Sequence, residues 1–571
     1  MGNDMTILIG GKAGQGIQTI GTILAGICHD AGLFVFSVDD FQSRIRGGHS
    51  FHLLRVGSRP LSAPSARPHI LVGIDENTYG IHRDELVPGG IAVLNRNGGN
   101  HADLEAQNGV FTVPLEDLAR DAGGVIASNT VAAGVVAAVM GVEMARVRSV
   151  VSRRFRDKGE KVLALNLDAA EKGYAAGKSI SFQAPVSFDG DTNGEHVVMS
   201  GAKAAALGAL AADCRFFPFY PMSPGTGIVS QLAAYAGQLP MVMEQAEDEI
   251  AAVNMAVGAA YAGVRSLVAT SGGGFSLMVE GLGLSGITET PIVIINAQRP
   301  GPATGLATRT AQADLLFAIH ASQDEFPRFV FAPGSVLDTF NAVKRAVMLS
   351  EKYQVPSIVL MDQYLADSAR TETNGFVTGD EHQSFIQDTE MYQAETYHRY
   401  KVTESGVSPR CLPCTPNALV RVAGNEHTPE GLPSEDPVNR VAMVDKRFAK
   451  LGAMTGEMRM PSVFCDNSSF FLVGWGSSKG CIMEACLHLR EEGIDAGWIL
   501  FEDLWPLDSH KLKVLLNGKR LLMVEGNATA QLGTLIRTLT GIEYAASILK
   551  YDGRPIYPEY IVDRVKEIQG Q

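Results

Sequence analysis

The sequence predicts an α/β fold in three domains, because apolar runs of strand length alternate with longer helical segments in three separate stretches. The chain has 571 residues, of which 46% are hydrophobic and 19% charged, so it can bury several large cores. Its 61 glycines, together with many alanines, indicate frequent tight turns and closely packed helices.

The first domain is expected to cover residues 1–190, with a nucleotide-binding-like layout. A strand at 6–9 leads into a glycine-rich turn at 10–16 and a helix that continues through Ile27. The turn lacks the Gly-Lys-Ser/Thr ending of a P-loop, and Thr19 stands where a dinucleotide fingerprint has its third glycine. It therefore fits a tight strand-to-helix connection and a phosphate site at the helix start equally well. Further strands are predicted at 34–38, 50–56, 69–72 and 91–94.

A basic segment precedes the strand at 50–56. Arg44, Arg46 and His49 lie beside two adjacent glycines, Gly47 and Gly48. This composition fits a solvated strand end and an anion-binding loop equally well.

The second domain is expected to cover residues 191–372, after a polar linker at 188–195, with strands at 216–219, 267–269, 292–296 and 357–361. Residues 373–455 show little periodicity and are predicted to form a long connecting segment. The third domain, residues 456–571, is predicted to have strands at 470–474, 498–501 and 520–524 and helices at 481–492 and 530–539.

Glu249 is the leading candidate for a catalytic residue. It opens a small-residue helix in which Ile250, Val253 and Val257 are spaced to face a core, and Gly258 follows nine positions later. The turn at 220–226 lies upstream, and the Thr-Ser-Gly-Gly-Gly turn at 270–274 lies downstream. An acid beside such a face is partly desolvated, so its proton affinity can be tuned.

These motifs resemble the pyrimidine-binding domain of thiamine-diphosphate enzymes. The turn Tyr220-Pro-Met-Ser-Pro is similar to the Tyr-Pro-Ile-Thr-Pro turn of the 2-oxoacid:ferredoxin oxidoreductases. Almost the whole chain resembles the fused gamma/alpha subunit of that family, most closely its 2-oxoglutarate branch. The resemblance implies a gamma-type domain, then a pyrimidine-binding domain, then a domain similar to the transketolase C-terminal domain, where Val524-Glu-Gly-Asn527 is the matching segment.

The resemblance implies roles for individual residues. Glu249 would bond the pyrimidine ring nitrogen and so favour the tautomer whose amino group takes the proton. Glu244 and Glu247 are near enough to compete for this role. Further cofactor contacts are implied for Tyr220, Pro221 and Ser271.

The resemblance also implies a substrate site for a 2-oxoacid with two carboxylates. Ser223 stands where the family has the Thr that contacts the substrate carboxylate. Arg299 and Thr304 lie on a loop that resembles the substrate loop of 2-oxoglutarate members, and Arg309 follows it. An Arg binds a carboxylate with two parallel hydrogen bonds, so these residues suit the second carboxylate. An Arg that only braces its loop is the alternative.

Coenzyme A is the implied cosubstrate. The candidate contacts are Gly14, Gly16, Arg46, Gly47 and Gly48, because the family's gamma-type domain carries a similar Arg-Gly-Gly segment.

The chain shows no Gly-Asp-Gly with an Asn some thirty residues later, the usual diphosphate–magnesium pattern. We therefore expect a beta-type partner subunit to supply Mg²⁺ and a [4Fe-4S] cluster, ferredoxin to accept the electrons, and the assembly to be a dimer of heterodimers. Cys411 and Cys414 form a CxxC pair with no second pair, which favours a loop with two free thiols over a metal site.

Composition excludes several other classes. The net charge of −14 argues against nucleic acid and anionic membrane as partners. The longest apolar stretch, 122–142, is interrupted by Ser128, Asn129 and Thr130, so no membrane span is predicted. The first residues lack the basic and apolar regions of a signal peptide, so a cytoplasmic protein is expected.

The implied function is oxidative decarboxylation of 2-oxoglutarate with coenzyme A to succinyl-CoA and CO₂, reducing ferredoxin, with the reverse carboxylation also possible. The same chemistry on pyruvate, branched-chain 2-oxoacids or indolepyruvate is the alternative. A non-catalytic scaffold that binds coenzyme A is an alternative of another class, and the presence of Glu249 and Arg299 argues against it.

Overall fold

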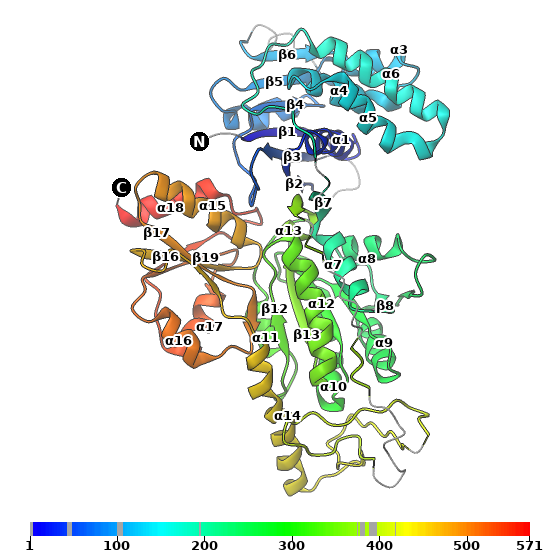
Figure 1. Cartoon of the computed structure of the whole chain (residues 1–571), viewed down its shortest axis with the longest axis vertical. Helices are drawn as coiled ribbons and strands as arrows, with labels where there is room; N and C mark the ends of the chain where they lie inside the picture. Colours follow the sequence, from blue (N-terminus) through cyan, green and yellow to red (C-terminus); the bar gives the residue numbers. More distant parts are fainter. Residues whose placement is uncertain are drawn as a thin grey trace. The chain divides into compact units, whose positions relative to one another are not determined.

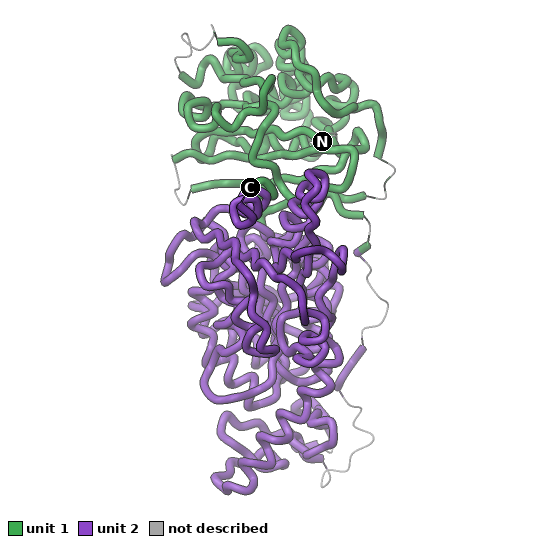
Figure 2. Tube along the Cα trace, turned by 90° about the vertical axis from the view of Figure 1, so that its left-hand side faces the viewer, with its two compact units in different colours: residues 1–199, 367–375, 557–559 green, residues 200–366, 376–556, 560–571 purple. Residues whose placement is uncertain are grey.

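The computed structural model describes residues 4–42, 48–99, 107–192, 194, 196–373, 375–376, 383–386, 397–416 and 418–570. The chain forms two compact units (Figure 2). The first unit combines residues 1–199 with 367–375 and 557–559, and the second unit combines 200–366 with 376–556 and 560–571. The three-domain limits read from the sequence stay a prediction.

The first unit is built on an eight-stranded sheet in the order β6-β5-β4-β1-β3-β2-β14-β7 (Figure 1). The strands are β1 Asp4–Lys12, β2 Phe34–Asp40, β3 His49–Gly57, β4 Ile70–Gly73, β5 Ile91–Asn95, β6 Val110–Val113, β7 His196–Ser200 and β14 Ala369–Thr373. All the strands predicted in this region are present. β14 was not foreseen here, because it lies in the stretch attributed to the second domain yet pairs with β2. Such long-range pairing leaves no local sequence pattern.

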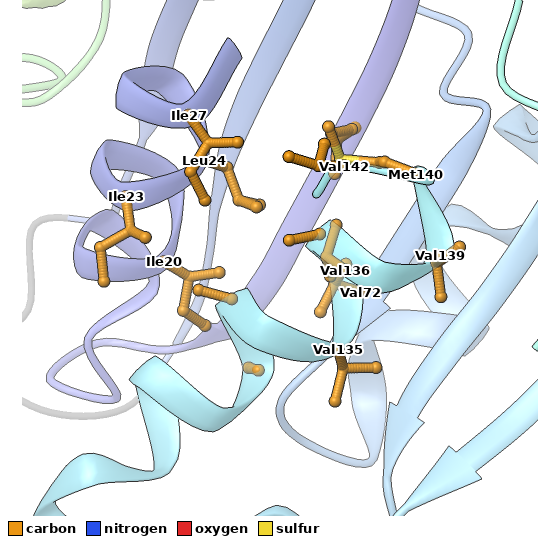
Figure 3. Packing of buried hydrophobic residues seen from close by; sticks show 14 of the residues in the cluster. Ile20, Ile23, Leu24, Ile27, Val72, Val135, Val136, Val139, Met140 and Val142 are labelled. Atoms are coloured by element: carbon orange, nitrogen blue, oxygen red, sulfur yellow. The ribbon is translucent and has the colours of Figure 1, made fainter. Parts of the chain in front are cut away.

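Helices cover this sheet and bury its apolar side chains. They are α1 Ile17–Asp30, α2 Asn77–His82, α3 Leu115–Asp121, α4 Ser128–Val139, α5 Met144–Phe155 and α6 Glu160–Gly177. Side chains of α1 and α4 meet in one core (Figure 3). α4 and α6 approach closely because each has a glycine facing the other helix. A Cβ atom added at Gly134 would lie 2.3 Å from the Ala170 oxygen, and one added at Gly173 would lie 2.1 Å from the Val131 oxygen.

The second unit contains two five-stranded sheets and a small parallel pair, β8 Phe216–Phe219 with β9 Val242–Gln245. The first sheet has the order β10-β11-β13-β12-β18 and the second the order β15-β17-β16-β19-β20. Their strands are β10 Leu267–Thr270, β11 Val293–Gln298, β12 Phe329–Phe331, β13 Ser357–Asp362, β15 Ser462–Phe464, β16 Phe470–Trp475, β17 Ala496–Phe501, β18 Asp503–Trp505, β19 Leu521–Glu525 and β20 Ala546–Leu549. β10 to β13 are parallel, so their carboxyl ends lie at one edge.

Helices cover both faces of the first of these sheets, which explains its nearly continuous apolar strands. Val268 and Ile294 pack with α9 Glu249–Tyr261 and α10 Gly272–Thr288. Leu267 and Ile295 pack with α7 Gly201–Ala211 and α12 Val336–Tyr353. The remaining helices are α8 Thr226–Ala233, α11 Leu315–His320, α13 Gln363–Asp367, α15 Ser478–Glu491, α16 Ser509–Leu516, α17 Gln531–Thr540 and α18 Pro558–Gln569.

One long helix was not predicted. Residues 373–455 were expected to lack regular structure, but α14 spans Pro437–Glu457. Asp436 caps it by accepting from the Val438 and Asn439 amides. Much of its buried face is cationic, with Lys446 and Lys450 paired to the buried Glu289. An ionic buried face does not produce the apolar periodicity on which the sequence prediction depended.

Candidate functional site

Glu249 is the first residue of α9, and its side chain is almost completely buried at 2% exposure. The preceding Asp248 caps the helix, with its carboxylate accepting from the Ala251 amide at 2.7 Å. Glu249 Oε1 is buried without a hydrogen-bond partner among the described residues. Glu244 and Glu247 are exposed, so of the three acids only Glu249 faces the interior.

The predicted inward face of α9 is partly wrong. Val253 and Val257 are buried as expected, but Ile250 is 48% exposed. Successive helix residues are rotated by about 100°, so burying Glu249 turns its neighbour Ile250 outward.

The glycine turn at the start of α10 lies directly against Glu249. A Cβ at Gly274 would lie 2.8 Å from Glu249 Oε1 and 2.1 Å from Thr270 Oγ1. Ser271, which precedes α10, is buried and makes no side-chain cap. The absence of a side chain at Gly274 lets the helix backbone approach the carboxylate closely, and the first amides of the helix make the surroundings of Glu249 electropositive.

The Tyr220 turn packs against the same end of β10. A Cβ at Gly225 would lie 2.9 Å from the Thr270 carbonyl oxygen. Tyr220, Pro221 and Ser223 are exposed on this turn. The turn therefore lies against Thr270, the residue whose hydroxyl also lies close to Gly274.

Arg299 joins the Tyr220 turn to Glu249. Its Nη1 donates to the Ser223 carbonyl at 2.7 Å, while its Nε is buried without a partner among the described residues. Burial lowers the pKa of the Arg299 guanidinium, and the charge of Glu249 opposes that shift. A partly desolvated cation with an unused donor is suited to bind a carboxylate.

The loop that follows Arg299 is folded back on itself. Leu306 donates its amide to the Pro300 carbonyl at 3.0 Å, and Gly305 has a positive φ of 50°. Thr304 is exposed on this loop. The loop reaches α10, because a Cβ at Gly273 would lie 3.7 Å from the Ala303 oxygen.

Arg309 has a different neighbour. A Cβ at Gly553, in the segment after β20, would lie 3.1 Å from Arg309 Cβ. The described contacts thus bring together Glu249, the glycine turn at the start of α10, Ser223 and Arg299, but do not place Arg309 beside Glu249.

Sequence reasoning missed three polar residues on or after β10 and β11. Thr270 and Asn296 are buried, and Asp314 follows in the loop before α11. Burial raises the pKa of Asp314, and its hydrogen bond from Asn296 partly offsets that rise. The sequence signal that could have found them is a polar residue directly after an apolar run, as at Thr270 and Asn296.

Five buried polar atoms near the start of α10 have no hydrogen-bond partner among the described residues: Glu249 Oε1, Thr270 Oγ1, Ser271 Oγ, Asn296 Oδ1 and Arg299 Nε. Unpaired buried polar groups are costly, and native proteins keep few of them. Their concentration here indicates a site for a polar ligand.

The residues proposed for coenzyme A lie in the first unit, or outside the described residues in the case of Arg46 and Gly47. Gly14 and Gly16 precede α1 with positive φ angles of 90° and 75°. No atom would contact a Cβ at Gly14 within 4 Å, whereas a Cβ at Gly16 would lie 2.0 Å from Asn129 Nδ2. Gly48 also has a positive φ, 75°. The backbone conformation therefore favours glycine at all three positions.

The CxxC pair forms no disulfide: Cys411 is a buried free thiol and Cys414 an exposed one. No group of three or more His, Cys, Asp or Glu side chains suited to a metal ion occurs within the described ranges.

Comparisons with known proteins identify the family. Residues 6–176 match the model for pyruvate ferredoxin/flavodoxin oxidoreductase, and residues 207–446 match the model for the thiamine diphosphate-binding part of pyruvate flavodoxin/ferredoxin oxidoreductase. The alpha subunit of a 2-oxoacid:ferredoxin oxidoreductase from Saccharolobus solfataricus is 30% identical, over 98% of this chain and 97% of the relative. The chain belongs to the 2-oxoacid:ferredoxin oxidoreductase family.

Two further relatives belong to the 2-oxoglutarate branch. The 2-oxoglutarate oxidoreductase subunit KorA of Mycobacterium tuberculosis is 28% identical, over 94% of this chain and 87% of its own. The 2-oxoglutarate:ferredoxin oxidoreductase of Magnetococcus marinus, solved with 2-oxoglutarate, coenzyme A and succinyl-CoA bound, is 32% identical with a TM-score of 0.90, over 99% of this chain and all of that chain. The family and the α/β fold class predicted from the sequence are confirmed.

Thiamine diphosphate fits the residues at this site. Its aminopyrimidine needs a buried acceptor beside a backbone surface that it can approach closely. Glu249 Oε1 is buried and unpaired, and the glycines of α10 leave the adjoining surface without side chains.

Within the described ranges, no helix has the length and hydropathy that a bilayer crossing needs.

Proposed function

We propose that this chain is the subunit of a 2-oxoglutarate:ferredoxin oxidoreductase that binds the substrate and the thiamine pyrimidine. The reaction converts 2-oxoglutarate and coenzyme A to succinyl-CoA and CO₂, and passes two electrons to ferredoxin. The observation that carries this proposal is Arg299, a half-buried cation with an unused Nε that interacts electrostatically with Glu249. Similarity to the Magnetococcus marinus enzyme along almost the whole chain supports the choice of substrate.

Each residue has a defined task in this proposal. Thiamine diphosphate, when bound, supplies the nucleophilic carbon for 2-oxoacid decarboxylation. Glu249 holds the proton at the pyrimidine ring nitrogen, and Ser271 and Tyr220 line the ring site with Pro221. Arg299 binds a substrate carboxylate, and the nearby Ser223 and Thr304 offer hydroxyl groups.

Coenzyme A is assigned to the first unit. Gly14 and Gly16 open α1, a 14-residue helix whose first amides can receive a phosphate. Gly48, with the adjoining Arg46 and Gly47, is the second candidate contact. Arg309 remains a candidate for the distal carboxylate of the substrate.

The decisive experiment is reconstitution with a beta-type subunit, followed by assay of ferredoxin reduction with several 2-oxoacids. 2-Oxoglutarate should react fastest, and turnover should require coenzyme A. Faster turnover of pyruvate would reassign the substrate, and no turnover of any 2-oxoacid would overturn the proposal.

The first prediction concerns the partner subunit. Purified alone, the chain should be colourless and should bind thiamine diphosphate poorly, because the cluster and the diphosphate–Mg²⁺ site are assigned to the partner.

Ile250 and Leu277 are 48% and 49% exposed on the helices that carry Glu249 and Gly274, as expected of a docking surface. Ile250→Glu should therefore weaken co-purification of the two subunits.

Leu487→Glu is the matched control, since Leu487 is 50% exposed on α15. It should leave co-purification unchanged. Cluster absorbance from the chain alone would contradict this division of labour.

The second prediction concerns substrate choice. Arg299→Met should raise KM for 2-oxoglutarate about tenfold or more, because a carboxylate that loses its cation costs at least ~1.4 kcal/mol. If Arg299 binds the distal carboxylate, pyruvate turnover should be spared. If it binds the carboxylate that leaves as CO₂, both substrates should be affected equally.

Steady-state kinetics of Arg299→Met and Arg309→Met separate the two arginines. Unchanged kinetics for Arg299→Met would mean that it only braces the loop through the Ser223 carbonyl. The distal carboxylate would then be assigned to Arg309.

A further inference from the structure

Asn296 and Asp314 form a polar pair beside the Glu249 site. Asn296 lies on β11 and is the register partner of Thr270 on β10. Asn296 Nδ2 donates to Asp314 Oδ2 at 3.0 Å. Because Nδ2 is the donor in this bond, the amide oxygen of Asn296 points away from Asp314. That oxygen is buried and has no partner among the described residues.

Asp314 and Glu249 touch the same helix turn. A Cβ at Gly272 would lie 2.5 Å from Asp314 Oδ2, and one at Gly274 would lie 2.8 Å from Glu249 Oε1. The unpaired oxygens of Thr270 and Asn296 belong to paired positions on the neighbouring strands β10 and β11. Two carboxyl groups and two unpaired oxygens thus surround the start of α10.

Residues that follow β19, including the first residue of α17, hold the loop that carries Asp314. On one side, the Gln312 amide donates to the Gly526 oxygen at 2.8 Å, and Asn527 Nδ2 donates to the Gln312 oxygen at 2.9 Å. On the other side, Gln531 Nε2 donates to the Ala313 oxygen at 2.7 Å, and Gln531 Oε1 accepts from the Leu316 amide at 3.1 Å.

We propose that Asp314 is a positioning residue for the ligand bound against Glu249. It orients the Asn296 amide so that the amide oxygen accepts from an N–H or O–H group of that ligand. Gln531, at the start of α17, bonds Ala313 and Leu316, which flank Asp314, so α17 influences the site through this loop. The inference rests on the proposed function, because that function defines the ligand.

The carboxyl group can be tested with two substitutions in the assembled enzyme. Asp314→Asn keeps an oxygen that accepts from Asn296, whereas Asp314→Leu has similar size and no acceptor. Asp314→Leu should lower kcat about tenfold or more, since small misplacements of a binding group are costly. Asp314→Asn should restore kcat to within about threefold of the unchanged enzyme, because the amide orientation is retained. Two results would overturn the proposal. If kcat fell equally in both variants, the charge of Asp314 would act directly. If kcat fell in neither variant, Asp314 would have no role at the site.

A remote substitution tests the connection to α17 and can still be made if Asp314→Leu fails to fold. Gln531→Leu should lower kcat about threefold or more, and should add little in an Asp314→Leu background, because residues of one network are not additive. Thr538→Ala on the same helix is the control, since among the described residues the Thr538 hydroxyl bonds to the Thr534 oxygen within α17. An unchanged kcat in Gln531→Leu, or a fully additive double variant, would overturn the link.

Hydrogen exchange of the chain alone separates this inference from the proposed function. Amides at 271–276 should exchange faster in Asp314→Leu and Gln531→Leu but not in Asp314→Asn. If 2-oxoglutarate is not turned over yet this exchange pattern holds, the proposed function fails alone. If turnover is normal and exchange is the same in all variants, the positioning role fails alone.

Discussion

Glu249→Gln should lower kcat of the assembled enzyme by about 10²-fold or more, the loss expected when a general acid–base group is removed. Glutamine keeps the shape of the side chain but is neutral and cannot hold the proton at the pyrimidine ring. The folded chain should lose little stability, because the substitution removes the attraction to Arg299 but no hydrogen bond of Glu249 Oε1 within the described residues, and it also removes a buried charge. The thermal midpoint of the chain alone should stay the same or rise, as is common when a buried functional charge is neutralised.

Glu247→Gln is the matched control, since Glu247 lies two residues earlier and is exposed. It should keep nearly full activity. Steady-state kinetics and thermal unfolding of both variants provide the comparison. A larger loss in Glu247→Gln than in Glu249→Gln would show that the acid was assigned to the wrong residue.

Much of the fold could be predicted from local sequence patterns. Strands such as β10, β11 and β13 are short apolar runs next to turn residues, and both faces of their sheet are covered by helices. The pairing of β14 with β2 could not be predicted, because the two strands are far apart in the chain. Ile250 was misplaced because the apolar pattern of α9 does not show that Glu249 occupies the buried position.

The site could be predicted in part. Glu249, Ser223 and Arg299 were found through motifs, and the structure brings them together at the carboxyl edge of one sheet. Asn296 and Asp314 were missed because a single polar residue within or after a strand is common, and only the fold shows that the two are hydrogen-bonded. The roles of all these residues stay predictions until variants are measured.

The helix α14 was missed because part of the interaction that buries it is ionic. Lys446 Nζ and Lys450 Nζ each lie 2.5 Å from a carboxylate oxygen of Glu289, and all three side chains are at most 1% exposed. Burial alone would raise the pKa of Glu289, but Lys450, Lys446 and Arg399 outweigh burial and hold it well below its usual range. A depressed carboxyl pKa stabilises the fold above the ordinary glutamate pKa, and this stability is lost only as the pH falls through the lowered value.

Glu289→Gln should therefore destabilise the chain strongly. It leaves two buried ammonium groups without their shared carboxylate, and removing one partner of a buried ion pair typically costs about 3–5 kcal/mol. Urea unfolding near neutral pH, followed by circular dichroism, measures this loss as a lower midpoint. Glu430→Gln is the control, because Glu430 pairs with His398 where the two side chains are 43% and 35% exposed, and an exposed pair contributes at most about 1 kcal/mol. If both substitutions shifted the midpoint equally, the buried ionic group would not be what holds α14 against the end of α10.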